Sequence, residues 1–162
     1  ELQTVKADAT RRLPFDDKSF DVVWSSGLLE HFSFEERVSM LKDWCRLSRR
    51  EVISLVPNAA CLPYRVGKKM QELDGTWPYG LETPLASLVK DFEAAGMCVV
   101  EERTIAPLHA LRYLSRRHPL RTFLQSWYKQ QGVMPPQDFG QGYLLLTRGT
   151  VSNRLAACRE AQ

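Results

Sequence analysis

The chain has 162 residues, of which 44% are hydrophobic and 25% are charged, a balance typical of a globular domain with a buried core. Its formal net charge of +3 is too small to indicate nucleic-acid binding by itself, and no apolar run approaches the roughly 20 residues that span a bilayer. The four cysteines form no C-x-x-C pair, so we expect no metal site, and without a signal peptide their wide spacing indicates reduced thiols and a cytoplasmic protein.

The first part of the chain alternates predicted strands with a predicted helix. Residues 1–7 have the pattern of a short strand, and the apolar run 20–24 is typical of a buried strand. Ser33 and Glu36 have the spacing of a capping box, which predicts a helix that begins after Ser33. The run 51–56 predicts the next strand, so this part indicates a parallel α/β arrangement.

The remainder continues with further elements of both kinds. We expect an aromatic-rich irregular segment at about 59–82, and then a helix opened by Thr83 and Pro84 and ended by Gly96. The patterns that follow predict, in order, a strand at 97–105, two helices within 108–130 and a strand at 142–148.

Small or polar residues follow three of the predicted strands. They are Asp8 and Ala9, the run Ser25-Ser26-Gly27, and Pro57 with Asn58. Ligands of open parallel sheets bind beyond the carboxyl ends of the strands, so these residues are candidates to line a cleft. The alternative is that they only form turns, in which Asp, Ser, Asn and Gly are favoured anyway.

The order of several short motifs resembles a known family. The chain carries DA at 8–9, LPF at 13–15, FDVV at 20–23 and LEH at 29–31. Together they resemble the class I S-adenosylmethionine-dependent methyltransferases, in particular the small-molecule and lipid enzymes of the "methyltransferase type 11" kind. The resemblance implies an α/β, Rossmann-like sheet that is mostly parallel and ends in an antiparallel strand pair.

The same resemblance defines what we expect of the domain. The family's glycine-rich loop and its ribose-binding acid would lie upstream of Glu1, so we expect the C-terminal part of the domain, with N-terminal strands missing. We assign 1–150 to this partial domain, with lid insertions at about 59–82 and 106–141, and 151–162 to a C-terminal tail.

The resemblance also implies S-adenosylmethionine as the cofactor. Asp8 matches the acid that contacts the adenine amine, and the backbone of Ala9 can serve the adenine ring. The residues that match the segment along the methionine part of the cofactor are Ser25, Ser26 and Leu28.

Glu30 and His31 are the candidate catalytic residues. A base is needed only where the acceptor must lose a proton, and a neutral imidazole takes a proton near pH 7. The Glu-His-Phe run also resembles cyclopropane fatty acid synthases, in which the Glu helps to hold a bicarbonate base. The alternative is that Glu30 and His31 begin a helix and bond to the backbone or to each other.

Two segments supply the candidate acceptor-binding residues. They are Tyr64, Trp77, Tyr79 and Glu82 in the first, and His109 and Arg112 in the second. The aromatic residues either cover the acceptor or pack as a small satellite core. Residues 103–137 contain no acid, so the amphipathic segment 107–130 either contacts an anionic membrane or substrate, or packs its leucines and leaves its arginines solvated.

These observations predict methyl transfer from S-adenosylmethionine to a small-molecule or lipid-like acceptor. An RNA methyltransferase is an alternative that the basic segment permits, although no aromatic-glycine RNA-binding signature is present. A non-catalytic, truncated half-domain that acts as an interaction module is the alternative from another class. We expect no transmembrane segment.

Overall fold

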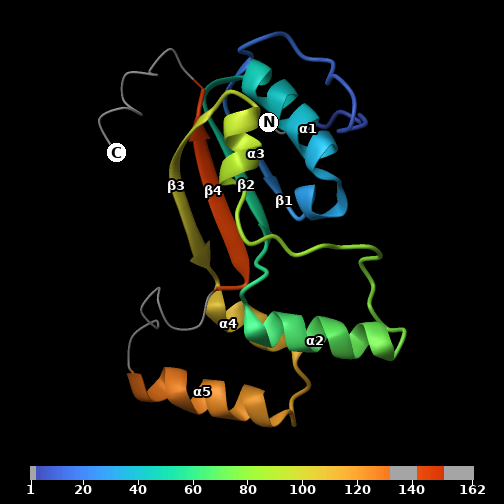
Figure 1. The fold of residues 1–162 in the computed structure, drawn as a ribbon, viewed down its shortest axis with the longest axis vertical. Coiled ribbons are helices and arrows are strands. Elements are labelled where there is room, and N and C mark those ends of the chain that lie inside the picture. Colours follow the sequence, from blue (N-terminus) through green and yellow to red (C-terminus); the bar gives the residue numbers. More distant parts are fainter. Residues whose placement is uncertain (1–2, 132–141, 152–162) are drawn as a thin grey trace. The chain divides into compact units, whose positions relative to one another are not determined.

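The computed structural model describes residues 3–131 and 142–151 (Figure 1). The elements in chain order are β1 (Phe20–Ser26), η1 (Leu29–His31), α1 (Phe34–Leu47), β2 (Ser48–Pro57), α2 (Leu62–Leu73), α3 (Val89–Ala94), β3 (Cys98–Ile105), α4 (Pro107–Ala110), η2 (Leu111–Tyr113), α5 (Pro119–Gln131) and β4 (Leu144–Thr150). The α/β class predicted from the sequence is therefore confirmed.

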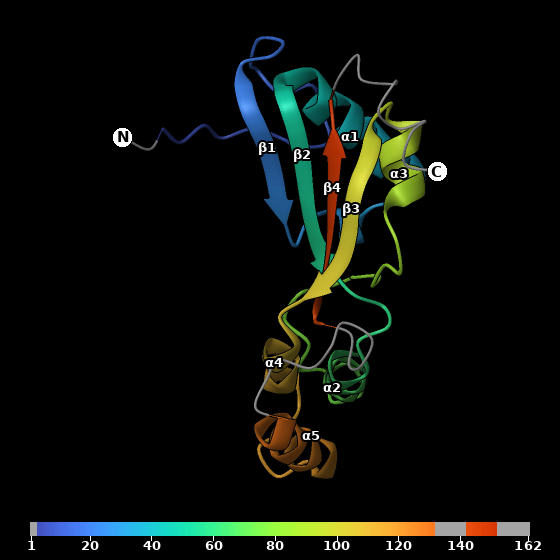
Figure 2. The same ribbon diagram turned by 90° about the vertical axis from the view of Figure 1, so that its left-hand side faces the viewer.

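The four strands form one sheet in the order β1-β2-β4-β3. Strands β1 and β2 run in the same direction, and β4 runs opposite to both of its neighbours, β2 and β3 (Figure 2). The predicted antiparallel pair is thus β3 with β4. Because β4 lies between β2 and β3, it is also antiparallel to β2. Two of the three neighbouring strand pairs are therefore antiparallel (Figure 2), and the expectation of a mostly parallel sheet is wrong for the described strands.

The chain divides into two compact units. The first comprises the described parts of Glu1–Ser54, Ser87–Glu102 and Thr147–Gln162, and the second comprises those of Leu55–Ala86 and Arg103–Leu146. Strands β2, β3 and β4 contribute residues to both units. The predicted assignment of 1–150 to one partial domain stays a prediction. Of the predicted tail 151–162 and the predicted insertion 106–141, residues 152–162 and 132–141 lie outside the described residues.

The core of the first unit forms where α1 and α3 cover one face of the sheet (Figures 1 and 2). The predicted capping box starts α1: the backbone N–H of Ser33 donates to Glu36 Oε2 at 2.8 Å, and that of Glu36 donates to Ser33 Oγ at 3.3 Å. The buried apolar residues of the two helices are Met40, Leu41, Trp44, Leu47 and Phe92.

The cap leads to a first prediction. Replacing Ser33 with alanine is expected to lower the free energy of unfolding by about 1 kcal/mol, because the amide of Glu36 loses its acceptor. Urea denaturation measures the change. Ser39→Ala on the exposed face of α1 is the matched control and should leave stability within about 0.5 kcal/mol. Equal losses in both variants would contradict the role of the cap.

Two expectations about the first strands are wrong. Residues 3–7 form no strand and are exposed. Strand β1 is present but is not buried: Phe20, Val22 and Trp24 are 39%, 41% and 66% exposed. Alternate side chains of a strand point to opposite faces, so these three exposed side chains share one face of the sheet.

The segment expected to be irregular contains α2. Pro63 suits the first turn of this helix, and Gly67 lies in its middle. A Cβ at Gly67 would collide with the Tyr113 carbonyl of η2, so glycine permits the close approach of these two elements. Proline and glycine usually indicate a loop in a sequence. Here the first-turn position explains the proline, and the close approach explains the glycine.

The next helix begins later than Thr83 and Pro84 predict, because Leu85 forms a parallel bridge with Asn58. The N–H of Leu85 donates to Pro57 O at 3.1 Å, and its carbonyl accepts from the N–H of Ala59 at 3.0 Å. Helix α3 therefore begins at Val89. Its predicted end is confirmed, since Gly96 follows with a left-handed φ of 86°.

The cysteines differ in state. Cys45 and Cys61 are free, whereas Cys98 is disulfide-bonded, so the expectation of reduced thiols is wrong at that residue. Burial raises the pKa of Cys61 to about 11 and also raises the pKa of Cys45. Both free thiols are therefore protonated at neutral pH and are poor nucleophiles.

Candidate functional site

Asp8 ends the N-terminal segment in a turn that holds its carboxylate. Its Oδ1 accepts from the backbone N–H of Thr10 at 2.9 Å and from Thr10 Oγ1 at 2.7 Å, and its Oδ2 lies 3.4 Å from Arg11 Nε. The Thr10 hydroxyl, then the Thr10 amide, hold the pKa of Asp8 below its usual value. Asp8 is exposed and ionised at neutral pH, and Oδ2, which is paired with Arg11 on the surface, retains lone pairs that can accept from a ligand.

The predicted polar end of β1 lies in the same unit. Ser25 Oγ is 3.5 Å from Ser54 Oγ on the neighbouring strand β2, and Ser26 is exposed. Gly27 then turns the chain with a φ of 68°, and Leu28 is half-buried. This geometry fits both interpretations, a ligand-lining strand end and a turn.

Glu30 and His31 follow in the short 3-10 turn η1. Glu30 is 3% exposed, and its Oε1 lies 3.8 Å from His31 Nε2. His31 itself is exposed, so a buried carboxylate can orient an imidazole that solvent and ligands reach. The 3.8 Å separation also fits the alternative interpretation, in which the two side chains contact each other, and the two residues precede α1 rather than begin it.

Arg37 of α1 fixes the backbone directly after this turn. Its Nη1 donates to the carbonyl of Phe32 at 2.9 Å, and its Nε donates to Asp91 Oδ1 of α3 at 2.5 Å. The side chains of Arg37 and Asp91 are 13% and 5% exposed. A nearly buried ion pair therefore connects η1 to both helices of the first unit.

A cavity of about 310 Å³ in the first unit lies against α1. Asp43 and Arg46 line it and hold the LPF segment: Asp43 Oδ2 accepts from the N–H of Leu13 at 2.9 Å, and Arg46 Nη1 donates to Phe15 O at 2.8 Å. Of the predicted cofactor-binding residues, Ala9 lines this cavity.

The second unit gathers most of the predicted acceptor-binding residues. Tyr64 of α2 is fully buried, and its hydroxyl donates to Glu82 Oε1. Burial, and then the hydrogen bond to Glu82, raise the pKa of Tyr64, so the hydroxyl stays protonated. The Trp77 ring lies 6.3 Å from that of Tyr64 and 5.1 Å from that of Tyr79.

Two tyrosines that the sequence did not single out complete this aromatic cluster. The rings of Tyr113 and Tyr143 each lie 5.1 Å from that of Tyr64, and His109 stacks on Tyr143 at 5.1 Å. Burial, and then the charge of Arg112, lower the pKa of His109. The zero exposure of Tyr64 favours a packing role for that residue.

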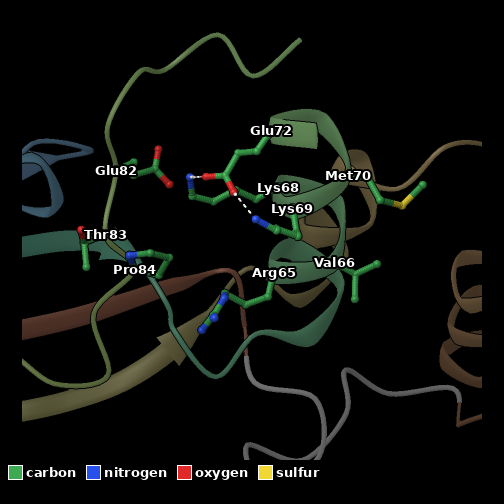
Figure 3. Close-up of a pocket in the computed structure, with 9 residues that line it drawn as sticks. All are labelled: Arg65, Val66, Lys68, Lys69, Met70, Glu72, Glu82, Thr83 and Pro84. Atoms are coloured by element: carbon green, nitrogen blue, oxygen red, sulfur yellow. Dashed lines mark hydrogen bonds and ion pairs between the residues drawn. The ribbon is translucent and has the colours of Figure 1, made fainter. Parts of the chain in front are cut away.

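Two cavities open beside this cluster in the second unit. The α2 pocket, of about 690 Å³, lies between α2 and residues 82–84 (Figure 3), and its lining residues are Arg65, Val66, Lys68, Lys69, Met70, Glu72, Glu82, Thr83 and Pro84. The basic groove, of about 450 Å³, is lined by Leu108, Leu111, Arg112, Arg121, Gln125 and Lys129.

The basic groove has the character expected of the segment 107–130. Three of its lining residues are cationic and none is acidic, and Leu108 is 52% exposed. Leu111 and Leu114 are buried, so part of the predicted apolar stripe packs inside the unit. Among the residues that the structure describes, no helix combines the length and apolar character needed to span a bilayer.

Comparisons with known proteins agree with this geometry. Residues 1–56 match the model of a methyltransferase domain family. The fold is similar to that of an Archaeoglobus fulgidus SAM-dependent methyltransferase, with 16% identity, a TM-score of 0.57, and coverage of 90% of this chain and 66% of the other. The chain has the fold of the class I S-adenosylmethionine-dependent methyltransferases. The predicted fold is therefore confirmed, and the predicted similarity to a methyltransferase family is present over residues 1–56.

Two further structures of this fold are similar. A SAM-dependent methyltransferase of Thermotoga maritima has 19% identity and a TM-score of 0.57, with coverage of 91% of this chain and 63% of the other. Geranyl diphosphate C-methyltransferase of Streptomyces coelicolor has 9% identity and a TM-score of 0.53, with coverage of 90% and 51%. The chain thus spans between half and two thirds of the length of all three structures. The comparison with curated proteins found no match.

Proposed function

We propose that the protein transfers a methyl group from S-adenosylmethionine to a small-molecule or lipid-like acceptor. The observation that carries this proposal is the position of three motifs in one unit of a methyltransferase fold. They are the Asp8 turn, the strand end at Ser25 and Ser26, and the Glu30–His31 turn. Similar structures contain small molecules: the Streptomyces coelicolor enzyme holds geranyl diphosphate and S-adenosyl-L-homocysteine.

The residues of the first unit fit part of the cofactor. Asp8 is ionised, and its Oδ2 can accept a hydrogen bond from the adenine amine. Ser25 and Ser26, with the backbone of Leu28, would lie along the methionine part. When bound, the cofactor supplies an electrophilic methyl group on a sulfonium sulfur.

His31 is the proposed base for an acceptor that must lose a proton. The imidazole would take the acceptor's proton, and the Glu30 carboxylate at 3.8 Å would orient the ring and stabilise its charged form. Exposure of His31 gives an acceptor access to the ring, while burial of Glu30 keeps that carboxylate in place. The remaining barrier is lowered by positioning and by exclusion of water.

The proposed surroundings of the acceptor are Trp77, Tyr79, Glu82 and His109, and the buried Tyr64 supports them by packing against the Trp77 ring. The basic groove with Arg112 is the proposed contact to an anionic membrane or substrate. The three cations of this groove also favour RNA as a second acceptor class. Binding of S-adenosylhomocysteine separates both enzyme functions from a non-catalytic interaction module.

Replacing Asp8 with alanine, in a version that carries the complete methyltransferase domain, tests the cofactor site. The affinity for S-adenosylhomocysteine, measured by titration calorimetry, should fall about tenfold because the adenine amine loses its acceptor. Asp16→Ala is the control, since Asp16 is also an exposed acid of the same segment. An unchanged affinity in Asp8→Ala, or the same loss in both variants, would remove Asp8 from the adenine site.

A further inference from the structure

The α2 pocket has the size and lining of a small-molecule site. Its volume of about 690 Å³ lies within the range of roughly 300–1,000 Å³ that such sites occupy. Val66, Met70 and Pro84 give it an apolar part. Its charged part is formed by Arg65, Lys68, Lys69, Glu72 and Glu82, whose side chains are drawn in Figure 3.

The lysines of this pocket share a single carboxylate. Lys68 Nζ donates to Glu72 Oε1, and Lys69 Nζ lies 3.9 Å from Glu72 Oε2 (Figure 3). The Lys68 bond first, and the charges of Lys68, Lys69 and Arg65 in addition, lower the pKa of Glu72. The second carboxylate, Glu82, accepts the Tyr64 hydroxyl. Three cations therefore line the pocket with two acids.

The side chains of Lys68 and Glu72 differ in how firmly they are held in place. The Lys68 side chain is 7% exposed, and its ammonium lies 4.5 Å from the centre of the Trp77 ring, an additional cation–π contact. Glu72 is 38% exposed in the last turn of α2. Because Glu72 can turn into solvent while Lys68 stays fixed, another anion can take its place.

We propose that the α2 pocket binds the anionic group of an amphiphilic ligand, a carboxylate or a phosphate monoester on an apolar body, in the place of Glu72 between Lys68 and Lys69. The apolar body lies against Val66, Met70 and Pro84, and Arg65 adds a third cation. That this ligand is the methyl acceptor rests on the function proposed above. The binding itself does not.

Titration calorimetry of the whole chain with four probes tests the ligand class. Octyl phosphate and octanoate should bind, octylamine should bind at least tenfold more weakly, and inorganic phosphate should bind weakly because it lacks the apolar body. Equal binding of octyl phosphate and octylamine would overturn the proposal. If inorganic phosphate bound as tightly as octyl phosphate, the pocket would be a simple phosphate site, and the proposal of an amphiphilic ligand would be overturned.

Two substitutions of opposite effect locate the binding. Lys69→Gln, at a side chain that is 68% exposed, should weaken octyl phosphate binding about three- to five-fold, whereas Glu72→Gln should strengthen it about as much. Lys90→Gln, an exposed lysine of α3, is the charge-matched control and should change nothing. Weaker binding in Glu72→Gln would mean that the carboxylate attracts a cationic ligand, and would overturn the proposal.

A parallel titration with S-adenosylhomocysteine separates this inference from the proposed function. In a version that carries the complete methyltransferase domain, octyl phosphate binding without cofactor binding would leave the pocket assigned and overturn methyl transfer. Cofactor binding without octyl phosphate binding would overturn the pocket assignment alone.

Discussion

Replacing Arg37 with methionine is expected to lower the free energy of unfolding by about 3–5 kcal/mol. The guanidinium lies 2.5 Å from Asp91 Oδ1, and the two side chains are 13% and 5% exposed. Methionine keeps the apolar length of the arginine but leaves the Asp91 carboxylate buried without its cation. The substitution also removes the Arg37 donor to the carbonyl of Phe32, which holds the backbone after His31.

Urea denaturation measures the change in the free energy of unfolding, and two further variants serve for comparison. Arg49→Met breaks an ion pair with Asp21 whose side chains are 53% and 67% exposed, so it should cost at most about 1 kcal/mol. Arg37→Met combined with Asp91→Leu should recover most of the loss, because it removes the unpaired charge as well. If Arg37→Met cost no more than Arg49→Met, the pair would not stabilise the fold.

The fold was predictable where a local signal decides the structure. The capping box of Ser33 and Glu36 starts α1, and Gly96 ends α3 with the left-handed backbone that glycine favours. The sequence-based predictions were wrong where a residue far away in the sequence determines the local structure. Glycine occupies position 67 of α2 because Tyr113 approaches it closely, and Leu85 is extended because Asn58 pairs with it.

The candidate site was predictable to a similar degree. Motif order singled out Glu30 and His31, whose side chains lie 3.8 Å apart, and their catalytic role stays a prediction. Residue type drew attention to Tyr64 and Trp77, whose rings lie near each other in one cluster. Tyr143 was missed because it joins this cluster from a position 79 residues after Tyr64, a pairing that no spacing along one helix or strand encodes.

The polar residues of the α2 pocket show what sequence spacing predicts and what only the burial in the structure adds. Lys68 and Glu72 have the i, i+4 spacing of a surface ion pair, which an exposed helix commonly carries. The sequence cannot show that Lys68 is buried beneath an indole while Glu72 remains partly exposed. That difference in burial, rather than the spacing, is what makes the carboxylate replaceable by a ligand.

Replacing His31 with glutamine is expected to lower turnover roughly 10²- to 10⁴-fold with an acceptor that must lose a proton. Glutamine keeps hydrogen-bonding capacity next to Glu30 but cannot take up a proton. Turnover is measured as release of S-adenosylhomocysteine with a series of hydroxyl-bearing acceptors. The affinity for S-adenosylhomocysteine is measured by calorimetry and should change by no more than about twofold, because His31 is assigned to the acceptor.

The pH profile and a second histidine distinguish a base from a structural residue. His118 receives the backbone N–H of Leu120 on Nδ1 at the start of α5, so His118→Gln should leave the methyl-transfer rate unchanged. If His31 is the base, the rise of the methyl-transfer rate with pH in the unmodified protein should be absent from the remaining activity of His31→Gln. Equal turnover in His31→Gln and the unmodified protein would exclude His31 from proton transfer and leave positioning as the chain's contribution to catalysis.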